Sequence, residues 1–182
     1  DALGDEVVIL GHNYQQREII DYADFVGDSF QLSKQASTSD ARYVIFGGVT
    51  FMAESAAVIT DSDQQVILPN LQATCPMAGM AERSQVEEVF ETLQAGIDGD
   101  VVPICYMNSY ADLKAFTGEH GGVVCTSSNA EDAFEWAFER GEVVLFLPDR
   151  NLGKNSANRL GRENTAVIDP YDGPLTAETI AN

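Results

Sequence analysis

Basic residues are scarce in this sequence. Its 182 residues include 10 lysines and arginines against 29 aspartates and glutamates, which gives a formal net charge of −19. Only three of the basic residues are lysines: Lys34, Lys114 and Lys154. A surface of this charge repels polyanions, so we expect no nucleic-acid partner. Because the acids are dispersed rather than gathered in one block, a halophilic source is favoured over an ordinary acidic protein.

Long hydrophobic runs are also missing. The longest, such as residues 143–147, are far too short to cross a bilayer, and no charged-then-apolar leader opens the chain. We therefore expect a cytoplasmic protein with no membrane partner. The chain begins at Asp1 rather than Met and soon reaches a predicted strand, so we interpret it as an excerpt. Its three cysteines (Cys75, Cys105 and Cys125) have no close pairing, which favours thiols or metal ligands over disulfides.

Strand-like and helix-like segments alternate along the chain. The predicted strands are 7–10, 42–46, 65–68, 101–106, 122–125 and 142–147, and the predicted helices are 17–25, 30–36, 51–59, 85–95, one ending at 115, and 130–140. This alternation predicts an α/β fold with parallel sheets made of βαβ units. We expect two small pseudo-symmetric three-layer αβα domains, 1–84 and 85–169, followed by a segment 170–182. No dinucleotide-binding fingerprint or P-loop is present, so familiar kinds of nucleotide binding are not supported.

Polar residues follow most of the predicted strands. The segments are His12-Asn13-Tyr14, Gly48-Val49-Thr50, Tyr106-Met107-Asn108-Ser109, Thr126-Ser127-Ser128-Asn129 and Pro148-Asp149. In parallel α/β sheets, ligands bind beyond the carboxyl ends of the strands, where helix N-termini favour anions. Helix capping is the simpler explanation of any one such segment. Taken together, the segments predict a pocket for a small, multiply charged anion, with His12 available as a general acid or base.

The cysteines differ in their predicted surroundings. Cys75 lies in a loop after strand 65–68 and is a candidate metal ligand, with a buried free thiol as the alternative. Cys105 lies within a strand and is expected in the core, and Cys125 is a weaker candidate for lining the pocket. The second histidine, His120, is expected at the surface.

Seven segments between about residues 7 and 153 occur in a family's order and at its spacings. They are His12-Asn13-Tyr14, Gly27-Asp28-Ser29, Gly48-Val49-x-Phe51-Met52-Ala53-Glu54, Leu68-Pro69-Asn70-Leu71-Gln72-Ala73-x-Cys75, Tyr106-x-Asn108, Cys125-Thr126-Ser127-Ser128-Asn129-Ala130 and Phe146-Leu147-Pro148-Asp149-x-x-Leu152-Gly153. The combination is similar to quinolinate synthase. Each segment alone is a weak signal, but the ordered set is highly specific.

The resemblance implies three pseudo-symmetric α/β domains around one [4Fe-4S] cluster, with the third domain missing from this chain. Its reaction is the condensation of iminoaspartate with dihydroxyacetone phosphate to quinolinate, in NAD biosynthesis. A further implied partner is the enzyme that oxidises L-aspartate and supplies iminoaspartate. Three cysteines, one from each domain, hold three irons and leave the fourth open as a Lewis acid.

Carried over position by position, the resemblance gives seven residues a role, and Met107, between two of them, is predicted to bind substrate with them. Cys75 matches the cluster ligand of the first domain, and it is the only one of the three family ligands present. Tyr14 matches a tyrosine that assists proton transfer, and Ser127 matches a serine that binds the substrate carboxylate. The predicted catalytic residues are His12, Tyr14 and Tyr106. The predicted substrate-binding residues are His12, Ser29, Tyr106, Met107, Asn108 and Ser127.

The sequence departs from the family pattern after residue 153. Residues 171–174 begin the segment that carries the second cluster cysteine, but Leu175 stands in the cysteine's place and Glu178 in the place of a histidine. We therefore expect that the chain alone neither holds a stable cluster nor makes quinolinate. The alternative is a degenerate, non-catalytic homologue that binds a small dicarboxylate. Downstream DNA that encodes the missing cysteines would favour a fragment of an active synthase. A stop codon after Asn182 would favour the degenerate homologue.

Overall fold

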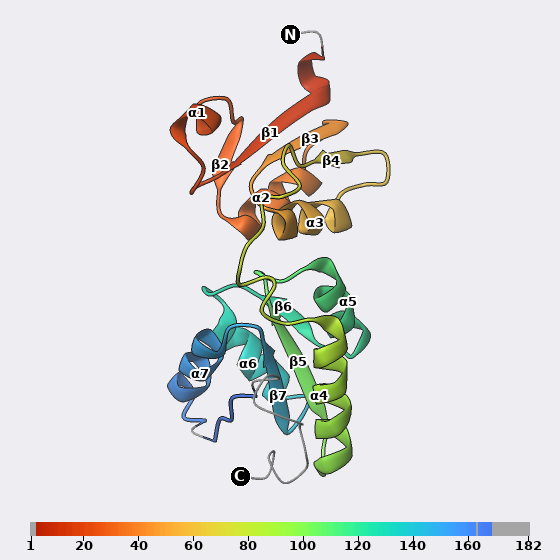
Figure 1. The fold of residues 1–182 in the computed structure, drawn as a ribbon, viewed down its shortest axis with the longest axis vertical. Helices are drawn as coiled ribbons and strands as arrows, with labels where there is room; N and C mark the ends of the chain where they lie inside the picture. Colours follow the sequence, from red (N-terminus) through yellow and green to blue (C-terminus); the bar gives the residue numbers. More distant parts are fainter. Residues whose placement is uncertain (1–2, 163, 169–182) are drawn as a thin grey trace. The chain divides into compact units, whose positions relative to one another are not determined.

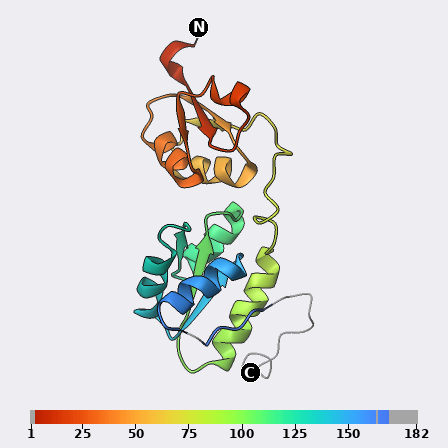
Figure 2. The same ribbon diagram turned by 90° about the vertical axis from the view of Figure 1, so that its left-hand side faces the viewer.

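The computed structural model describes residues 3–162 and 164–168. The chain divides into two compact units, 1–78 and 79–182, each built around its own parallel sheet (Figures 1 and 2). The predicted α/β class with two parallel-sheet units is therefore confirmed. The predicted C-terminal segment 170–182, in which Leu175 and Glu178 depart from the family pattern, lies outside the described residues. No helix in the described part of the chain has the length and apolar character needed to cross a membrane.

The first unit has four parallel strands in the order β2-β1-β3-β4. After a 3-10 turn at Gly4–Glu6, its elements are β1 (Val7–His12), α1 (Arg17–Ile20), β2 (Phe25–Gly27), α2 (Ser29–Ser37), β3 (Tyr43–Gly47), α3 (Thr50–Ile59) and β4 (Gln65–Ile67). The first strand in the chain, β1, thus lies between β2 and β3 and is the central strand of these three, and the order reverses between β1 and β3. Ligands of open α/β sheets bind at such a reversal, beyond the carboxyl ends of the strands.

The two faces of this sheet are covered unequally. Leu10 and Phe46, which are partners in the register of β1 and β3, are fully buried on the face that α2 and α3 cover. The short helix α1 lies against the other face, where glycine lets it approach closely. A Cβ at Gly11 would stand 2.9 Å from the side chains of both Ile20 and Ala23. The lack of a side chain at Gly11 therefore positions α1 beside the end of β1.

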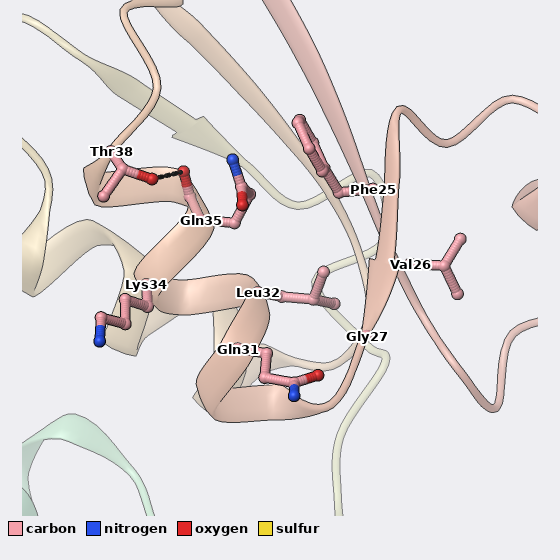
Figure 3. A pocket seen from close by; sticks show the side chains of 8 residues that line it. All are labelled: Phe25, Val26, Gly27, Gln31, Leu32, Lys34, Gln35 and Thr38. Atoms are coloured by element: carbon pink, nitrogen blue, oxygen red, sulfur yellow. Dashed lines mark hydrogen bonds between the residues drawn. The ribbon is translucent and has the colours of Figure 1, made fainter.

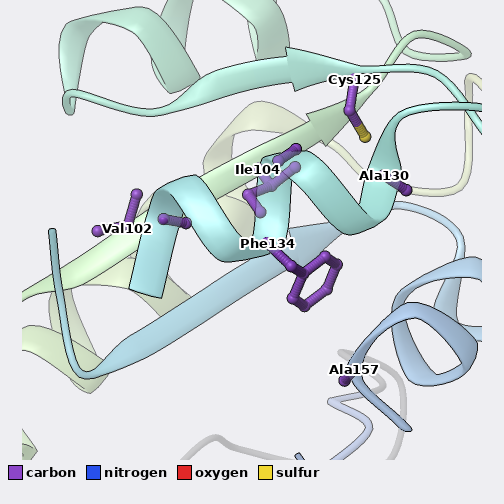
Figure 4. Packing of buried hydrophobic residues seen from close by; sticks show 8 residues of the cluster. Val102, Ile104, Cys125, Ala130, Phe134 and Ala157 are labelled. Atoms are coloured by element: carbon purple, nitrogen blue, oxygen red, sulfur yellow. The ribbon is translucent and has the colours of Figure 1, made fainter. Parts of the chain in front are cut away.

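The second unit has three parallel strands in the order β6-β5-β7. Its elements are α4 (Arg83–Gly96), β5 (Val101–Tyr106), α5 (Ala111–Glu119), β6 (Val123–Cys125), α6 (Ala130–Phe138), β7 (Val143–Leu147) and α7 (Arg150–Arg159). Ile104 and Phe134 belong to a buried cluster between the sheet and helices α6 and α7 (Figure 4). Cys105 and Phe116 belong to a second cluster on the side of α4 and α5. This unit is therefore a three-layer αβα sandwich.

The two units share one local topology, in which the first strand lies between the second and the third. In the first unit His12 is paired with Gly27, and in the second Tyr106 is paired with Cys125. The residue after each central strand then donates its backbone N–H to that partner's carbonyl oxygen: Asn13 to Gly27 at 3.1 Å, and Met107 to Cys125 at 2.7 Å. The same hydrogen bond at the same topological position supports the predicted pseudo-symmetry.

Two elements differ from the sequence-based expectation. The predicted helix 17–25 is wrong beyond Ile20, because Phe25 already belongs to β2. Asp24 is docked on β1, where its carboxylate accepts a hydrogen bond from the Ile9 N–H at 2.8 Å, and this excludes a helix there. Helix α7 was not predicted. Its start is set by Asp149, whose carboxylate accepts from the N–H groups of Asn151 and Leu152, as an N-cap does.

A matched pair of glycine substitutions tests the packing of the second unit. A Cβ at Gly122 would fall on the carbonyl oxygen of Pro103, whereas a Cβ at Gly118, within α5, would meet nothing within 4 Å. We expect Gly122→Ala to destabilise the protein by about 1–3 kcal/mol through overpacking. Gly118→Ala should instead be neutral or stabilising by up to about 1 kcal/mol. Denaturant unfolding measures both, and equal effects of the two substitutions would contradict the close packing described at Gly122.

Candidate functional site

His12 ends β1 and has a polar neighbour at each nitrogen of its ring. It is 6% exposed, although it lies at the carboxyl edge of the sheet. The backbone N–H of Tyr14 donates to Nδ1 at 3.3 Å, and Oγ of Ser29 lies 3.5 Å from Nε2. The structure therefore brings together two of the predicted site residues, His12 and Ser29, which are 17 positions apart in the chain.

Ser29 is positioned by the first turn of α2. Asp28, the N-cap, accepts hydrogen bonds through Oδ1 from the N–H groups of Phe30 at 3.0 Å and Gln31 at 2.8 Å. The Gln31 side chain accepts in return from the Asp28 N–H, which completes a capping box. This cap fixes the backbone on which Ser29 faces His12. From the sequence, Asp28 was noted only as part of a motif and was given no role. An Asp three residues before a Gln is nevertheless a recognised signal of a capping box.

The charge state of His12 reflects two opposing influences. Burial is the larger one and lowers the pKa of the imidazole, while the nearby negative charge of Asp28 raises it. The net direction is downward, which favours the neutral ring at neutral pH. Beside it, the Tyr14 ring meets the imidazole edge-on, with ring centroids 4.8 Å apart, and is 90% exposed. Tyr14 thus stands at the solvent side of the same strand end.

Cys75 lies half-buried in the loop after β4. This loop is anchored to the start of α3, because both the backbone N–H and the hydroxyl of Thr50 donate to the carbonyl oxygen of Ala73, at 2.9 and 3.0 Å. Since α3 follows β3 directly, the loop crosses the carboxyl edge of the sheet that also carries His12. The sequence analysis did not identify Thr50 as the residue that holds this loop. The structure records no contact between Cys75 and His12 or Ser29 among the described residues.

The predicted residues of the second unit also lie at strand ends. Tyr106 ends β5 and, like Asn108, is partly exposed, while the side chain of Met107 is buried and only 4% exposed. Ser127 is exposed in the turn before α6. In that turn Thr126 bonds to Ser128 Oγ at 2.8 Å and to Asn129 Oδ1 at 2.9 Å. These hydrogen bonds among Thr126, Ser128 and Asn129 hold the turn on which Ser127 is exposed.

The two units place these residues equivalently. His12 and Tyr106 are each the last residue of a central strand, paired with the last residue of its neighbour. Tyr14 and Asn108 each follow two positions later. Ser29 and Ser127 each lie two positions after the paired residue of the neighbouring strand. Each unit therefore presents hydroxyl, amide or imidazole groups on the same two adjacent loops.

The other cysteines are core residues. Cys105 is fully buried, as predicted. Cys125 is 1% exposed and packs with Ile104 and Phe134, so the suggestion that it lines the pocket is wrong. Burial raises the pKa of the Cys105 thiol, and burial, with a smaller effect of Cys105, raises the pKa of Cys125 to about 12. His120 is exposed at the end of α5, as predicted, and packs on Phe90 and Phe116.

A separate cavity of about 430 Å³ lies between β2 and α2 (Figure 3). Its lining consists of Phe25, Val26, Gly27, Gln31, Leu32, Lys34, Gln35 and Thr38. Figure 3 shows Leu32 directed from α2 towards β2. The cavity shares Gly27 with the strand end, but His12, Tyr14 and Ser29 do not line it. The candidate site is therefore the open edge of the sheet and not this cavity.

The fold and the site define a protein of two related parallel α/β units with polar groups at equivalent strand ends. The family model for quinolinate synthetase A protein matches residues 3–172. A quinolinate synthase of Haloarcula marismortui is 62% identical over 184 residues, covering 99% of this chain and 49% of the relative. One of Halobacterium salinarum is 63% identical over 183 residues (99% and 49%), and one of Streptomyces coelicolor is 53% identical over 187 residues (99% and 48%).

The chain belongs to the quinolinate synthase family, and it spans about half the length of the curated relatives it matches.

The burial of the three thiols predicts their order of reaction with iodoacetamide. At pH 8 a thiol with a pKa of about 12, such as Cys125, is thiolate in only about one molecule in ten thousand. We therefore expect alkylation of the folded protein at half-buried Cys75, with Cys105 and Cys125 reacting only after unfolding. Peptide mass spectrometry of timed samples identifies the labelled sites. Labelling of Cys105 or Cys125 as fast as Cys75 in the folded protein would show that the described core is wrong.

Proposed function

We propose that this chain is the part of a quinolinate synthase that binds its anionic substrates. In the complete enzyme, iminoaspartate condenses with dihydroxyacetone phosphate to give quinolinate, phosphate and water, a step of NAD biosynthesis in the cytoplasm. Family membership supports the reaction. The observation that carries the role of this chain is the pairing of His12 with Ser29 at the end of the central strand. The enzyme that oxidises L-aspartate is the proposed source of iminoaspartate.

The first unit binds a carboxylate with neutral hydrogen-bond donors. Nε2 of His12 and Oγ of Ser29 lie 3.5 Å apart, which is long for a hydrogen bond between them and leaves both groups available to a shared acceptor. The three basic residues of this unit have other neighbours than His12 and Ser29. Arg17 forms an ion pair with Asp21, Arg42 lies over the Tyr43 ring and Lys34 lines the separate cavity. Hydrogen bonds to a charged acceptor are strong enough to replace a salt bridge in this role.

The second unit contributes donors of the same kind. Tyr106 and Asn108 lie at the end of β5, and Ser127 lies in the exposed turn after β6. We propose that they too bind anionic oxygen atoms of the substrates. Met107 contributes through its backbone and not through its side chain, because the side chain is buried. Exposed Tyr14, in contact with the His12 ring, is the residue we assign to proton transfer with solvent.

An iron–sulfur cluster fits the described residues only in part. Cys75 supplies one half-buried thiol at the edge that carries His12, but no group of three or more His, Cys, Asp or Glu side chains that could hold a metal occurs within residues 3–162 and 164–168. We propose that Cys75 is one ligand of a [4Fe-4S] cluster whose other ligands lie outside these residues, and that the chain alone is inactive. When bound, such a cluster supplies a Lewis-acidic iron.

Succinate, a stable four-carbon dicarboxylate, tests the proposed binding role. We expect Ser29→Ala to weaken succinate binding by about tenfold or more, because a hydrogen bond to a charged acceptor is lost. Ser37→Ala is the matched control, since Ser37 lies in the same helix and its hydroxyl donates to the Lys34 carbonyl oxygen at 2.9 Å. Calorimetric titration of the three proteins gives the dissociation constants. Equal affinities, or no binding by the unmodified chain, would refute the role assigned to Ser29.

A further inference from the structure

The two histidines of this chain are held in opposite tautomers. A backbone N–H can only donate, so Nδ1 of His12, at 3.3 Å from the Tyr14 nitrogen, is an acceptor. The ring proton of neutral His12 is therefore on Nε2. A carbonyl oxygen can only accept, so Nδ1 of His120, at 2.8 Å from the Phe116 oxygen, carries the proton. The chain has no other histidine.

We propose that the Tyr14 backbone amide positions His12 as the Nε2–H tautomer, so that His12 donates a hydrogen bond to a substrate carboxylate. This inference rests on the proposed function and adds the direction of the hydrogen bond. Tyr14 acts here as a positioning residue through its main chain, in addition to the role assigned to its side chain. His12 then is a donor towards the carboxylate in the bound state, and not the base that receives a proton from it.

The surroundings of His12 keep this donor neutral. Burial opposes the charged form, and the pKa of the ring is lowered although Asp28 favours protonation. The Asp28 carboxylate is occupied by the N–H groups of Phe30 and Gln31 through Oδ1. The titratable groups that face the ring are Asp28 through its charge and Tyr14 through its ring. A neutral imidazole with Nδ1 occupied offers one group to a ligand, the Nε2–H.

The Nε2 side of the ring is where a carboxylate is expected. Ser29 Oγ, 3.5 Å away, is the group beside it and is itself a hydroxyl that both donates and accepts. With the Ser29 hydroxyl donating as well, the two groups match the oxygen atoms of a single carboxylate, whereas a cationic or purely apolar ligand gains nothing from a pair of donors. The chemical class selected by the pair is thus a carboxylate-bearing substrate.

Imidazole nitrogen spectroscopy tests the proposal without any substitution at or near His12. In the uniformly ¹⁵N-labelled chain, long-range ¹H–¹⁵N correlations at neutral pH identify the protonated nitrogen of each ring, and His120→Gln assigns the two. We expect Nε2–H for His12 and Nδ1–H for His120, with a scalar coupling across the hydrogen bond from the Tyr14 amide to His12 Nδ1. His12 as Nδ1–H, as a rapidly exchanging mixture, or without that coupling would overturn the proposal.

Substitutions at Tyr14 provide the second measurement. Tyr14→Phe keeps the amide and should leave the tautomer unchanged, whereas Tyr14→Pro removes the N–H. Loss of one hydrogen bond of ordinary strength should change the tautomer ratio of His12 by about fivefold towards Nδ1–H. An unchanged ratio in Tyr14→Pro would overturn the assignment. Should that variant not fold, the coupling in the unmodified chain decides the question.

Addition of succinate separates this inference from the proposed function. We expect the His12 Nε2–H resonance to shift on titration, with His120 unaffected. If His12 is the Nε2–H tautomer but its resonances do not respond to succinate, the tautomer stands and the proposed function fails. If succinate binds and the tautomer is Nδ1–H, the proposed function stands and this inference fails.

Discussion

The candidate site depends on the backbone hydrogen bond that closes the end of each central strand. Asn13 donates to Gly27 and Met107 donates to Cys125, so the loops after neighbouring parallel strands begin side by side in each unit. Parallel pairing carries the chain in one direction, and it therefore collects every strand-to-helix loop at one edge of a sheet. Once this bond is made, the sequence places His12 and Tyr106 one position before the donor of the bond. It places Ser29 and Ser127 two positions after the acceptor.

The sequence predicted the strands better than the short elements between them. Strand β5 has the predicted bounds, Val101–Tyr106, because a continuous apolar run ending in polar residues is typical of a buried parallel strand. Strand β2 was absorbed into a helix, since three residues carry no periodicity and their pairing with β1 is a long-range contact. The Asp149 cap of α7 was available in the sequence, but the mostly polar helix behind it gives a weak pattern.

For the site, sequence alone indicated which residues stand at strand ends but not how they are oriented. His12 was a candidate because of its position, whereas the tautomer follows only from the Tyr14 amide placed against Nδ1. The loop of Cys75 is tied to Thr50, 23 positions before Ala73, and no local signal announces that contact. Cys125 was misjudged because the side of the sheet on which a strand's last residue points depends on a register that the sequence does not show.

Neutral donors have a particular consequence in a chain of net charge −19. An anion that approaches such a surface is repelled at long range, and salt screens that repulsion. At contact, the hydrogen bonds that we propose from His12 and Ser29 to a carboxylate would persist in salt, because they are short-range and the pair is partly buried. An acidic surface and a site for carboxylates are therefore compatible when the surroundings are concentrated in salt.

The most direct test of this account is the footprint of succinate on the backbone amide resonances of the chain in molar KCl. The account predicts that the amides which shift lie at residues 12–14 and 27–30 in the first unit and at 106–108 and 125–129 in the second. A footprint confined to the cavity between β2 and α2, around Leu32, Lys34 and Thr38, would contradict it.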